Sequence, residues 1–437
     1  MEWELILLLM LGSILVLMVT GLPIAFVFMF LTLAGGLIFF GGEEGLRLVA
    51  MNMRASLSRF TLLPITMFVL LGQVMFRSGM GMNMLDALGK WLGRLPGRLA
   101  LIAVGFSTLF ATMSGSSVAS TSLMGTVLKP EMEKRGYKKP ISIGSIMGAG
   151  GLASLIPPSG LAIIIAVIGE ISIGRLLIAG IIPGLMIATL YASYIILRCN
   201  FQPSVAPPYE VTVPPLREKV RDTAKYVLPL GLIIFLVLGL IFLGVATPTE
   251  AAAMGAVGSL ILAAIYKKLT RDMFRQSVTG TLRTVVMVYM IIAMAVTFGQ
   301  IMAFSGVTIG LIEFALGLTV PPVVVIVFIM LTVLVMGTFM DVTAIIFISM
   351  PIFMPVIKAL GFDPVWFGLI MLVNIEMALT TPPFGMLLFV MKGVSDPDTT
   401  MGDIFRAGLP FLGCDAIAMG LVIVFPALAL WLPSNML

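Results

Sequence analysis

The sequence predicts an all-α polytopic membrane protein with an inverted structural repeat, two re-entrant helical hairpins and two broken helices. Hydrophobic residues make up 59% of the 437-residue chain and charged residues 11%, whereas about 25% charged residues are usual in soluble domains. A membrane-spanning helix needs about 20 apolar residues, and the continuous apolar segments provide roughly a dozen spans and half-spans. That number of spans is too large for a simple membrane anchor and is enough to enclose a pathway through the membrane.

The repeat has a period of 225 residues. Its clearest copies are the segments that begin MSGSSVAS at Met113 and TFMDVTAI at Thr338. Ser116 and Asp341 match across this shift (341 − 116 = 225). The other matched pairs are Pro23 and Pro248, Pro130 and Pro355, Gly136 and Gly361, and Pro157 and Pro382.

Each half contains an apolar segment interrupted by small polar residues, which predicts a re-entrant hairpin. The first hairpin is expected at about 99–128, with its tip at 114–117 and basic residues on both flanks. The second is expected at about 322–357, with its tip at 337–341 and almost no basic flank. Because loop lysines and arginines favour the cytoplasm, the hairpins should enter from opposite faces, as in inverted-repeat transporters.

Each hairpin is followed by an apolar segment that contains Pro-Pro, at 153–160 and at 378–385. Proline removes a backbone donor and disfavours helix at the preceding residue. Unwound backbone at membrane depth is tolerated only where it is buried in protein or lines a cavity. Duplicated broken segments of this kind indicate a transport site near the middle of the membrane.

Charge and proline define the domain organisation. We expect a first repeat at 1–198, a cytoplasmic linker at 199–225 and a second repeat at 226–437, because the linker is rich in proline and basic residues. Glu2 and Glu4 replace the basic start of a signal peptide, so the first helix is expected to be retained, with its N-terminus in the periplasm.

Composition also excludes several functions. The chain has no histidine and two cysteines without a CxxC motif, which argues against zinc and thiol redox chemistry. The net charge of +5 comes from loops between apolar spans and indicates orientation, not nucleic-acid binding. We expect no enzyme activity, because neither a nucleophile dyad nor an HExxH motif is present.

The four breaks carry the candidate chemistry. Unwound carbonyl groups suit a small hard cation, while half-helix N-termini favour an anion. Hydroxyl groups gather there, although serine and threonine in membrane helices also commonly bond neighbouring backbone. These residues are Ser114, Ser116, Ser117, Ser120, Thr121, Ser154 and Ser159 in the first half, and Thr338, Thr343, Thr380 and Thr381 in the second.

Three carboxylates lie in or beside apolar segments, where ionised groups are costly. Asp341 is predicted to accept hydrogen bonds from substrate hydroxyls or to support a cation, with a helix N-cap as the alternative. Glu250 fits a capping box with Thr247 better than a binding site. Glu376 has no obvious basic partner, and its role is left open.

Five motifs together resemble the large membrane subunit of TRAP (tripartite ATP-independent periplasmic) transporters, the DctM-like family, over essentially the whole chain. They are MSGSSVAS, LIPPSG, GVATPTEAAA, GTFMD and TTPPFG. The resemblance implies an elevator-type transporter of the ion transporter superfamily in the bacterial inner membrane. It also implies sodium-driven import of an organic acid, such as a C4-dicarboxylate or acidic sugar. A periplasmic binding protein would deliver the substrate, and a small four-helix membrane subunit, expected as a separate protein, would complete the complex.

The resemblance also implies residue roles, with two coupling Na⁺ ions. A first sodium site would use Ser114, Ser117 and the backbone of Ala153, Ile156 and Pro158. A second would use Gly337, Met340, Ala378 and Thr381, and the substrate would face Ser116, Ser159 and Asp341. The alternative is an ion-coupled carboxylate transporter of a related inverted-repeat fold that works alone.

Overall fold

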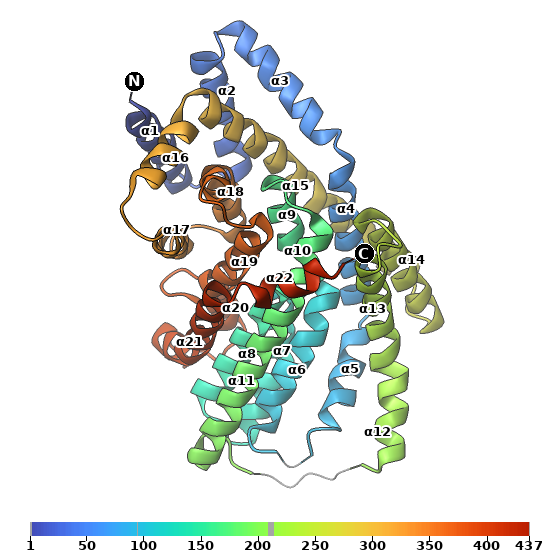
Figure 1. Cartoon of the computed structure of the whole chain (residues 1–437). Helices are drawn as coiled ribbons and strands as arrows, with labels where there is room; N and C mark the ends of the chain where they lie inside the picture. Colours follow the sequence, from blue (N-terminus) through green and yellow to red (C-terminus); the bar gives the residue numbers. More distant parts are fainter. Residues whose placement is uncertain (1, 94, 209–213, 437) are drawn as a thin grey trace.

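The computed structural model describes residues 2–93, 95–208 and 214–436, without the side chains of 111–114. This described part is helical and contains no strand (Figure 1). The first half comprises α1 (Trp3–Val19), α2 (Ile24–Phe39), α3 (Glu43–Leu57), α4 (Leu63–Arg77), α5 (Met80–Gly89), α6 (Arg98–Ser114), α7 (Ser117–Lys134), α8 (Lys139–Gly151), α9 (Gly160–Ile168), α10 (Ile173–Ala179) and α11 (Ile181–Phe201).

The second half comprises α12 (Leu216–Asp222), α13 (Leu228–Phe242), α14 (Pro248–Ile265), α15 (Arg271–Phe304), α16 (Val307–Gly317), α17 (Pro322–Gly337), α18 (Val342–Ala359), α19 (Pro364–Thr380), α20 (Met386–Gly393), α21 (Met401–Val424) and α22 (Ala427–Ser434). Seven helical segments of the described chain are long and apolar enough to cross a membrane. The polytopic, all-α fold class is therefore confirmed.

The sequence repeat is also a structural repeat. Helix α7 at 117–134 corresponds to α18 at 342–359, and α8 and α19 begin 225 residues apart, at Lys139 and Pro364. The main difference lies at α3 and α4, whose counterpart is the single helix α15. Pro64, in the first turn of α4, begins a new helix there, whereas its repeat counterpart Tyr289 continues α15.

The two hairpins, α6–α7 and α17–α18, enter from opposite ends of the molecule. Beside the base of the first, Lys139 Nζ donates to Asp403 Oδ2 at 3.2 Å, near the start of α21. Beside the base of the second, Trp366 Nε1 donates to the Val422 carbonyl at 2.9 Å, near its end. With a rise of 1.5 Å per residue, Asp403 and Val422 lie about 28 Å apart along α21. The repeats are therefore inverted.

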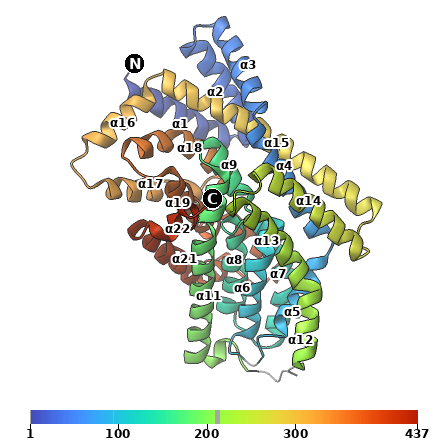
Figure 2. The same cartoon turned by 45° about the vertical axis from the view of Figure 1, so that its right-hand side comes forward.

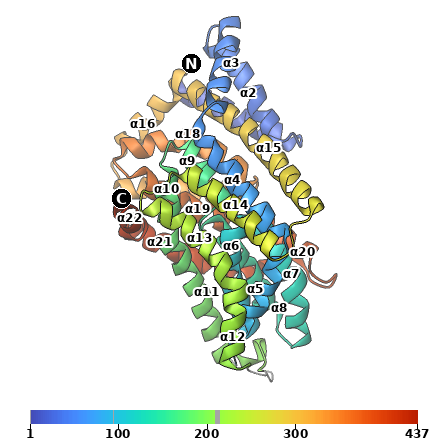
Figure 3. The same ribbon diagram turned by 90° about the vertical axis from the view of Figure 1, so that its right-hand side faces the viewer.

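The core surrounds the broken helices. All residues of α19 from Val365 to Thr380 are buried, and so are all residues of α8 from Ile141 to Gly151. By contrast, α13 buries only Leu230, Val237 and Ile241. Figure 2 shows α6, α8 and α11 side by side, and Figure 3 shows α14 and α15 alongside α4.

Several predicted boundaries need adjustment. The first hairpin continues beyond 128, because α7 extends through Pro130 to Lys134. Its charged end is stabilised by pairs one turn apart, between Lys129 and Glu133 at 2.6 Å and between Arg135 and Glu131 at 2.6 Å. Within the range predicted as a linker, 216–225 is helical, and the helix continues through residue 227 directly into α13.

Candidate functional site

Each hairpin tip packs against the Pro-Pro break of its own half. Gly115, at the first tip, has a φ of +57°, and a Cβ there would lie 3.8 Å from the Pro158 carbonyl oxygen. Gly337 is closer still, because a Cβ there would lie 2.4 Å from the Cβ of Ala378. Tip and break are therefore in contact in each half, and only at Gly337 does the contact depend on the absence of a side chain.

The first break is held by serine hydroxyls. The Gly151 carbonyl accepts from Ser154 Oγ at 2.9 Å and from Ser117 Oγ at 3.5 Å. Ser159 caps α9 by accepting from the Ala162 amide at 3.2 Å, and its hydroxyl donates to the Ser154 carbonyl at 2.5 Å. These oxygens of the backbone and of hydroxyl groups are hard ligands of the kind that small cations prefer.

The second break is held by threonines. Thr380 Oγ1 and Thr381 Oγ1 both donate to the Met377 carbonyl, at 3.1 Å and 2.6 Å. The Gly385 amide then closes the turn by donating to the Thr381 carbonyl at 3.0 Å. Both breaks contain a cis peptide bond, Pro157–Pro158 and Pro382–Pro383. The two proline pairs stand at matched positions in the repeat.

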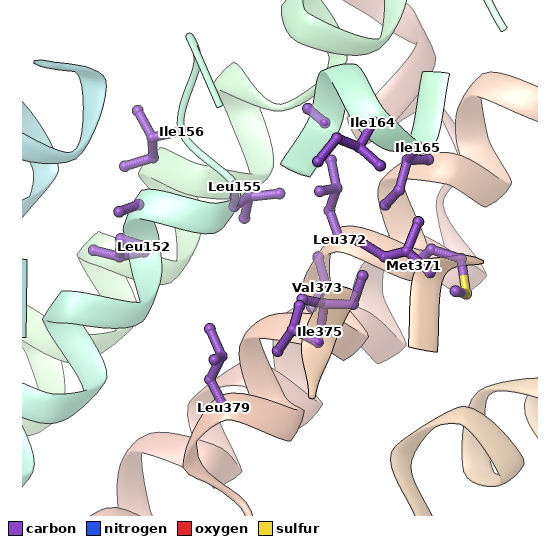
Figure 4. Packing of buried hydrophobic residues seen from close by; sticks show 14 of the residues in the cluster. Leu152, Leu155, Ile156, Ile164, Ile165, Met371, Leu372, Val373, Ile375 and Leu379 are labelled. Carbon is purple, nitrogen blue, oxygen red and sulfur yellow. The ribbon is translucent and has the colours of Figure 1, made fainter. Parts of the chain in front are cut away.

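Figure 4 shows apolar packing between the first break and α19. Leu152, Leu155 and Ile156 come from the break, while Leu372, Ile375 and Leu379 come from α19. All six side chains are buried. The two halves therefore share a continuous apolar core behind the polar tips.

The two tips differ in their caps. Ser116 caps α7 by accepting from the Ala119 amide at 3.3 Å. Asp341 caps α18 by accepting from the Thr343 amide at 2.9 Å, and its side chain is exposed. The capping alternative for Asp341 is thus present in the structure, and its exposure leaves the carboxylate accessible to a ligand.

A cavity of about 280 Å³ lies between the tips and the helices α4 and α15. Ser116 and Pro158 line it from the first half and Thr343 lines it from the second. The opposite wall carries Gln73 of α4 and Thr284 of α15. The site is thus an interface between broken helices and continuous helices.

The predicted residues fall into distinct environments. Ser116 and Pro158 line the cavity, whereas Ser159 is fully buried in its capping role and Asp341 lies two residues before the lining residue Thr343. Ser117, Ala153, Ile156, Gly337 and Ala378 are buried, and Met340 and Thr381 are partly buried. The side chain of Ser114 lies outside the described residues. Their roles as ligands stay predictions.

The polar residues on the opposite wall were not predicted from the sequence. Gln73 is a single amide within an apolar helix, which is a signal for an inward-facing polar group. Thr284 is a weaker signal, because threonine hydroxyls often bond a carbonyl one turn earlier in the same helix. Here its hydroxyl donates to the Gly280 carbonyl at 3.1 Å. Only the packing of α4 against α15 brings both residues to the cavity.

A buried acidic cluster lies behind the first break, where α11, α19 and α21 meet. The Tyr191 hydroxyl donates to Asp415 Oδ1, and Glu376 lies beside both residues. Within the described chain, neither carboxylate oxygen of Glu376 has a hydrogen-bond partner. A Cβ at Gly151, its counterpart in the repeat, would lie 3.1 Å from Glu376 Cγ. The role of Glu376 therefore stays open.

Glu250 occupies the position that its sequence pattern predicts. Its carboxylate accepts from the Thr247 amide at 2.8 Å, and the Glu250 amide donates to Thr247 Oγ1 at 3.3 Å. This reciprocal pair is a capping box at the start of α14. The capping interpretation is confirmed.

The model of the DctM component of tripartite ATP-independent periplasmic transporters matches residues 11–428. The chain belongs to this family. Among its relatives is the C4-dicarboxylate TRAP transporter large permease protein DctM of Pseudomonas aeruginosa, 33% identical over 408 residues that cover 92% of this chain and 93% of the relative. The sialic acid TRAP transporter large permease protein SiaM of Vibrio cholerae is 32% identical, with coverage of 97% and 98%.

A further relative is named for a different substrate, and a solved transporter structure shares the fold of this chain. The ectoine TRAP transporter large permease protein TeaC of Halomonas elongata is 28% identical, over 97% of this chain and 98% of the relative. The solved YdaH transporter of Alcanivorax borkumensis matches with a TM-score of 0.62 at 17% identity, covering 88% of this chain and 89% of that one. The DctM-family chain is thus a large permease component with a fold known from another transporter.

Proposed function

We propose that this DctM-family permease imports an organic acid, such as a C4-dicarboxylate or an acidic sugar, by symport with sodium. The observation that carries the proposal is the contact between each hairpin tip and its Pro-Pro break, which gathers carbonyl and hydroxyl oxygens in each half. A site made of carbonyl and hydroxyl oxygens, in a chain without histidine, is better suited to binding sodium than to transferring protons. Two sodium ions would bind, one in each half.

The substrate would bind in the cavity between the tips and helices α4 and α15. Ser116 lines this cavity and Asp341 lies beside it, so both can meet substrate hydroxyl groups once sodium offsets the carboxylate charge. The hairpins, α8, α9, α19 and α20 would then move together, as an elevator, against scaffold helices that include α4, α14 and α15. The cavity lies at the boundary between these two groups, which is where such a motion would take place.

The expected partners are a small membrane subunit and a periplasmic binding protein, because the family is tripartite. We place the permease in the bacterial inner membrane with its linker in the cytoplasm and its N-terminus in the periplasm. Basic residues beside the linker, including Arg198 and Lys225, support this orientation.

The test is uptake into proteoliposomes that contain both membrane subunits, with the binding protein outside. Succinate and N-acetylneuraminate serve as radiolabelled probes, each with the binding protein encoded beside this permease. We expect uptake that requires an inward sodium gradient and the binding protein. Equal uptake after replacing sodium with potassium would exclude sodium coupling, and uptake without the binding protein would favour a transporter that works alone.

A further inference from the structure

A second polar groove lies at the ends of α4 and α15 that face the linker. It has a volume of about 340 Å³ and is lined by Arg77, Arg275, Arg283 and Asp272, together with polar residues of α15. Three arginines from two helices thus meet with one carboxylate. The groove is separate from the cavity at the hairpin tips, although Gln73 of that cavity contacts Arg77.

Arg77 is held in place by amide groups. Its Nε donates to Gln73 Oε1 at 3.0 Å, and its Nη1 donates to Gln276 Oε1 at 2.9 Å. Gln276 is itself fixed, because its amide donates to Asp272 at 2.7 Å. A Cβ at Gly280 would lie 3.2 Å from Arg77 Nη2, so this glycine lets the guanidinium approach α15 closely. The guanidinium is therefore positioned before any ligand binds.

The positive charge in the groove is not balanced by ion pairs. Among the described residues, none of Arg77, Arg275 and Arg283 has a carboxylate oxygen within 4.0 Å. A planar guanidinium with free N–H groups is well suited to phosphate oxygens. The groove therefore has the chemistry of an anion site.

Its surroundings indicate the source of the anion. Large apolar side chains beside the arginines are exposed, namely Phe76, Phe274, Leu282 and Val286. The start of α15 lies on the linker side, because the Tyr266 hydroxyl just before it donates to the Lys225 carbonyl. Basic pockets between membrane helices, rimmed by apolar surface, bind lipid headgroups.

We propose that this groove binds the phosphodiester headgroup of an anionic lipid from the leaflet on the linker side. Arg275 and Arg283 lie two turns apart on α15, and Arg77 adds a third contact from α4. A headgroup bridging the two helices, with acyl chains along the adjacent apolar side chains, fixes α4 to α15. The site thereby stabilises the wall of the transport cavity without contacting the transported molecule.

The experiment is lipid retention on the purified, delipidated permease, measured by native mass spectrometry. Phosphatidylglycerol and phosphatidylcholine with identical acyl chains are offered together. We expect the wild type to prefer phosphatidylglycerol and the double variant Arg275→Gln/Arg283→Gln to lose that preference by about tenfold or more, because hydrogen bonds to charged groups contribute about 1.5–3 kcal/mol. Arg77 is left unchanged, since its amide contacts join the helices.

The control variant is Lys267→Gln/Lys268→Gln, which removes the same charge from exposed residues just before α15 that do not line the groove. It should keep the lipid preference, and melting temperatures should show that both variants are folded. Equal retention of the two lipids by the wild type, or an unchanged preference in the arginine variant, would overturn the proposal. Displacement of phosphatidylglycerol by an equal concentration of inorganic phosphate would assign the groove to a soluble anion and also overturn it.

Discussion

The two hairpin tips occupy equivalent positions in the repeat, yet they meet the rest of the protein differently. Gly115 has open space for a methyl group but a left-handed backbone, whereas Gly337 has helical backbone but touches Ala378. The first tip carries a serine cap and the second an exposed aspartate. The duplicated tips thus differ both in local backbone and in the side chains that they present near the cavity.

The largest expected effect comes from closing the space between Gly337 and Ala378. Gly337→Ala forces two Cβ atoms to 2.4 Å unless the hairpin shifts, and such overpacking costs typically 1–3 kcal/mol. We expect a lower melting temperature in nanodiscs and reduced uptake. The double variant Gly337→Ala/Ala378→Gly should recover most of the loss, because it removes the opposing methyl group.

Gly115→Ala is the corresponding test at the first tip, although the repeat pairs Gly115 with Met340 (115 + 225 = 340). The loss of stability comes from the left-handed backbone conformation and not from a steric clash, and it is about 1–2 kcal/mol for alanine. No change at a neighbouring residue should rescue it. A failure of Ala378→Gly to rescue Gly337→Ala would show that contact with Ala378 is not what constrains the second tip.

The next effect tests the difference in charge between the tips. Asp341→Asn preserves a good N-cap but removes the carboxylate. If Asp341 bonds the substrate, uptake should fall about tenfold or more, since hydrogen bonds to charged groups contribute about 1.5–3 kcal/mol, while the melting temperature stays near the wild-type value. Ser116→Ala should reduce uptake less. Wild-type uptake by Asp341→Asn would leave only the capping role.

A smaller effect is expected at the buried acidic cluster. Glu376→Gln keeps the shape of a side chain that has no counter-charge, so folding should be unaffected or slightly improved. Glu376→Ala leaves a cavity and should destabilise by about 2 kcal/mol or more. The readout is thermal unfolding of both variants. Strong destabilisation by Glu376→Gln would mean that the ionised carboxylate holds a cation.

The smallest effect concerns Lys129, which joins the first hairpin to the segment after α20. Its Nζ donates to Asp396 at 2.7 Å and to Glu133 at 2.6 Å. The bond from Lys129 lowers the pKa of Asp396, so its contribution is present above the unfolded-state pKa and is lost as pH falls through the lower folded-state value. Asp396→Asn should flatten this acidic part of the melting-temperature profile slightly. An identical profile would show that Glu133 alone holds Lys129.

The sequence was sufficient to predict the hairpins, the breaks and the inverted arrangement. Glycine, proline and small polar residues act locally on the backbone. Pro157 therefore marks a helix break, and Asp341 marks the start of a helix, without any knowledge of distant contacts. The apolar hairpin predicted at about 99–128 ends before its basic flank, whereas α7 continues through that flank to Lys134, where ion pairs stabilise the charged side chains. Gln73 and Thr284 could not be assigned, because they reach the cavity only through contacts between distant helices.

The contact between Gly151 and Glu376 has a consequence for the history of the fold. These residues are equivalent in the repeat (376 − 151 = 225) and face each other where the halves cross. Any side chain present at this position in both copies would have to share the same space. A symmetric ancestor could therefore carry only a small residue here, and a glutamate could arise in one copy only while the other stayed glycine. Where equivalent positions of an inverted repeat face each other, the two copies cannot both carry a large side chain, so the residues there become different.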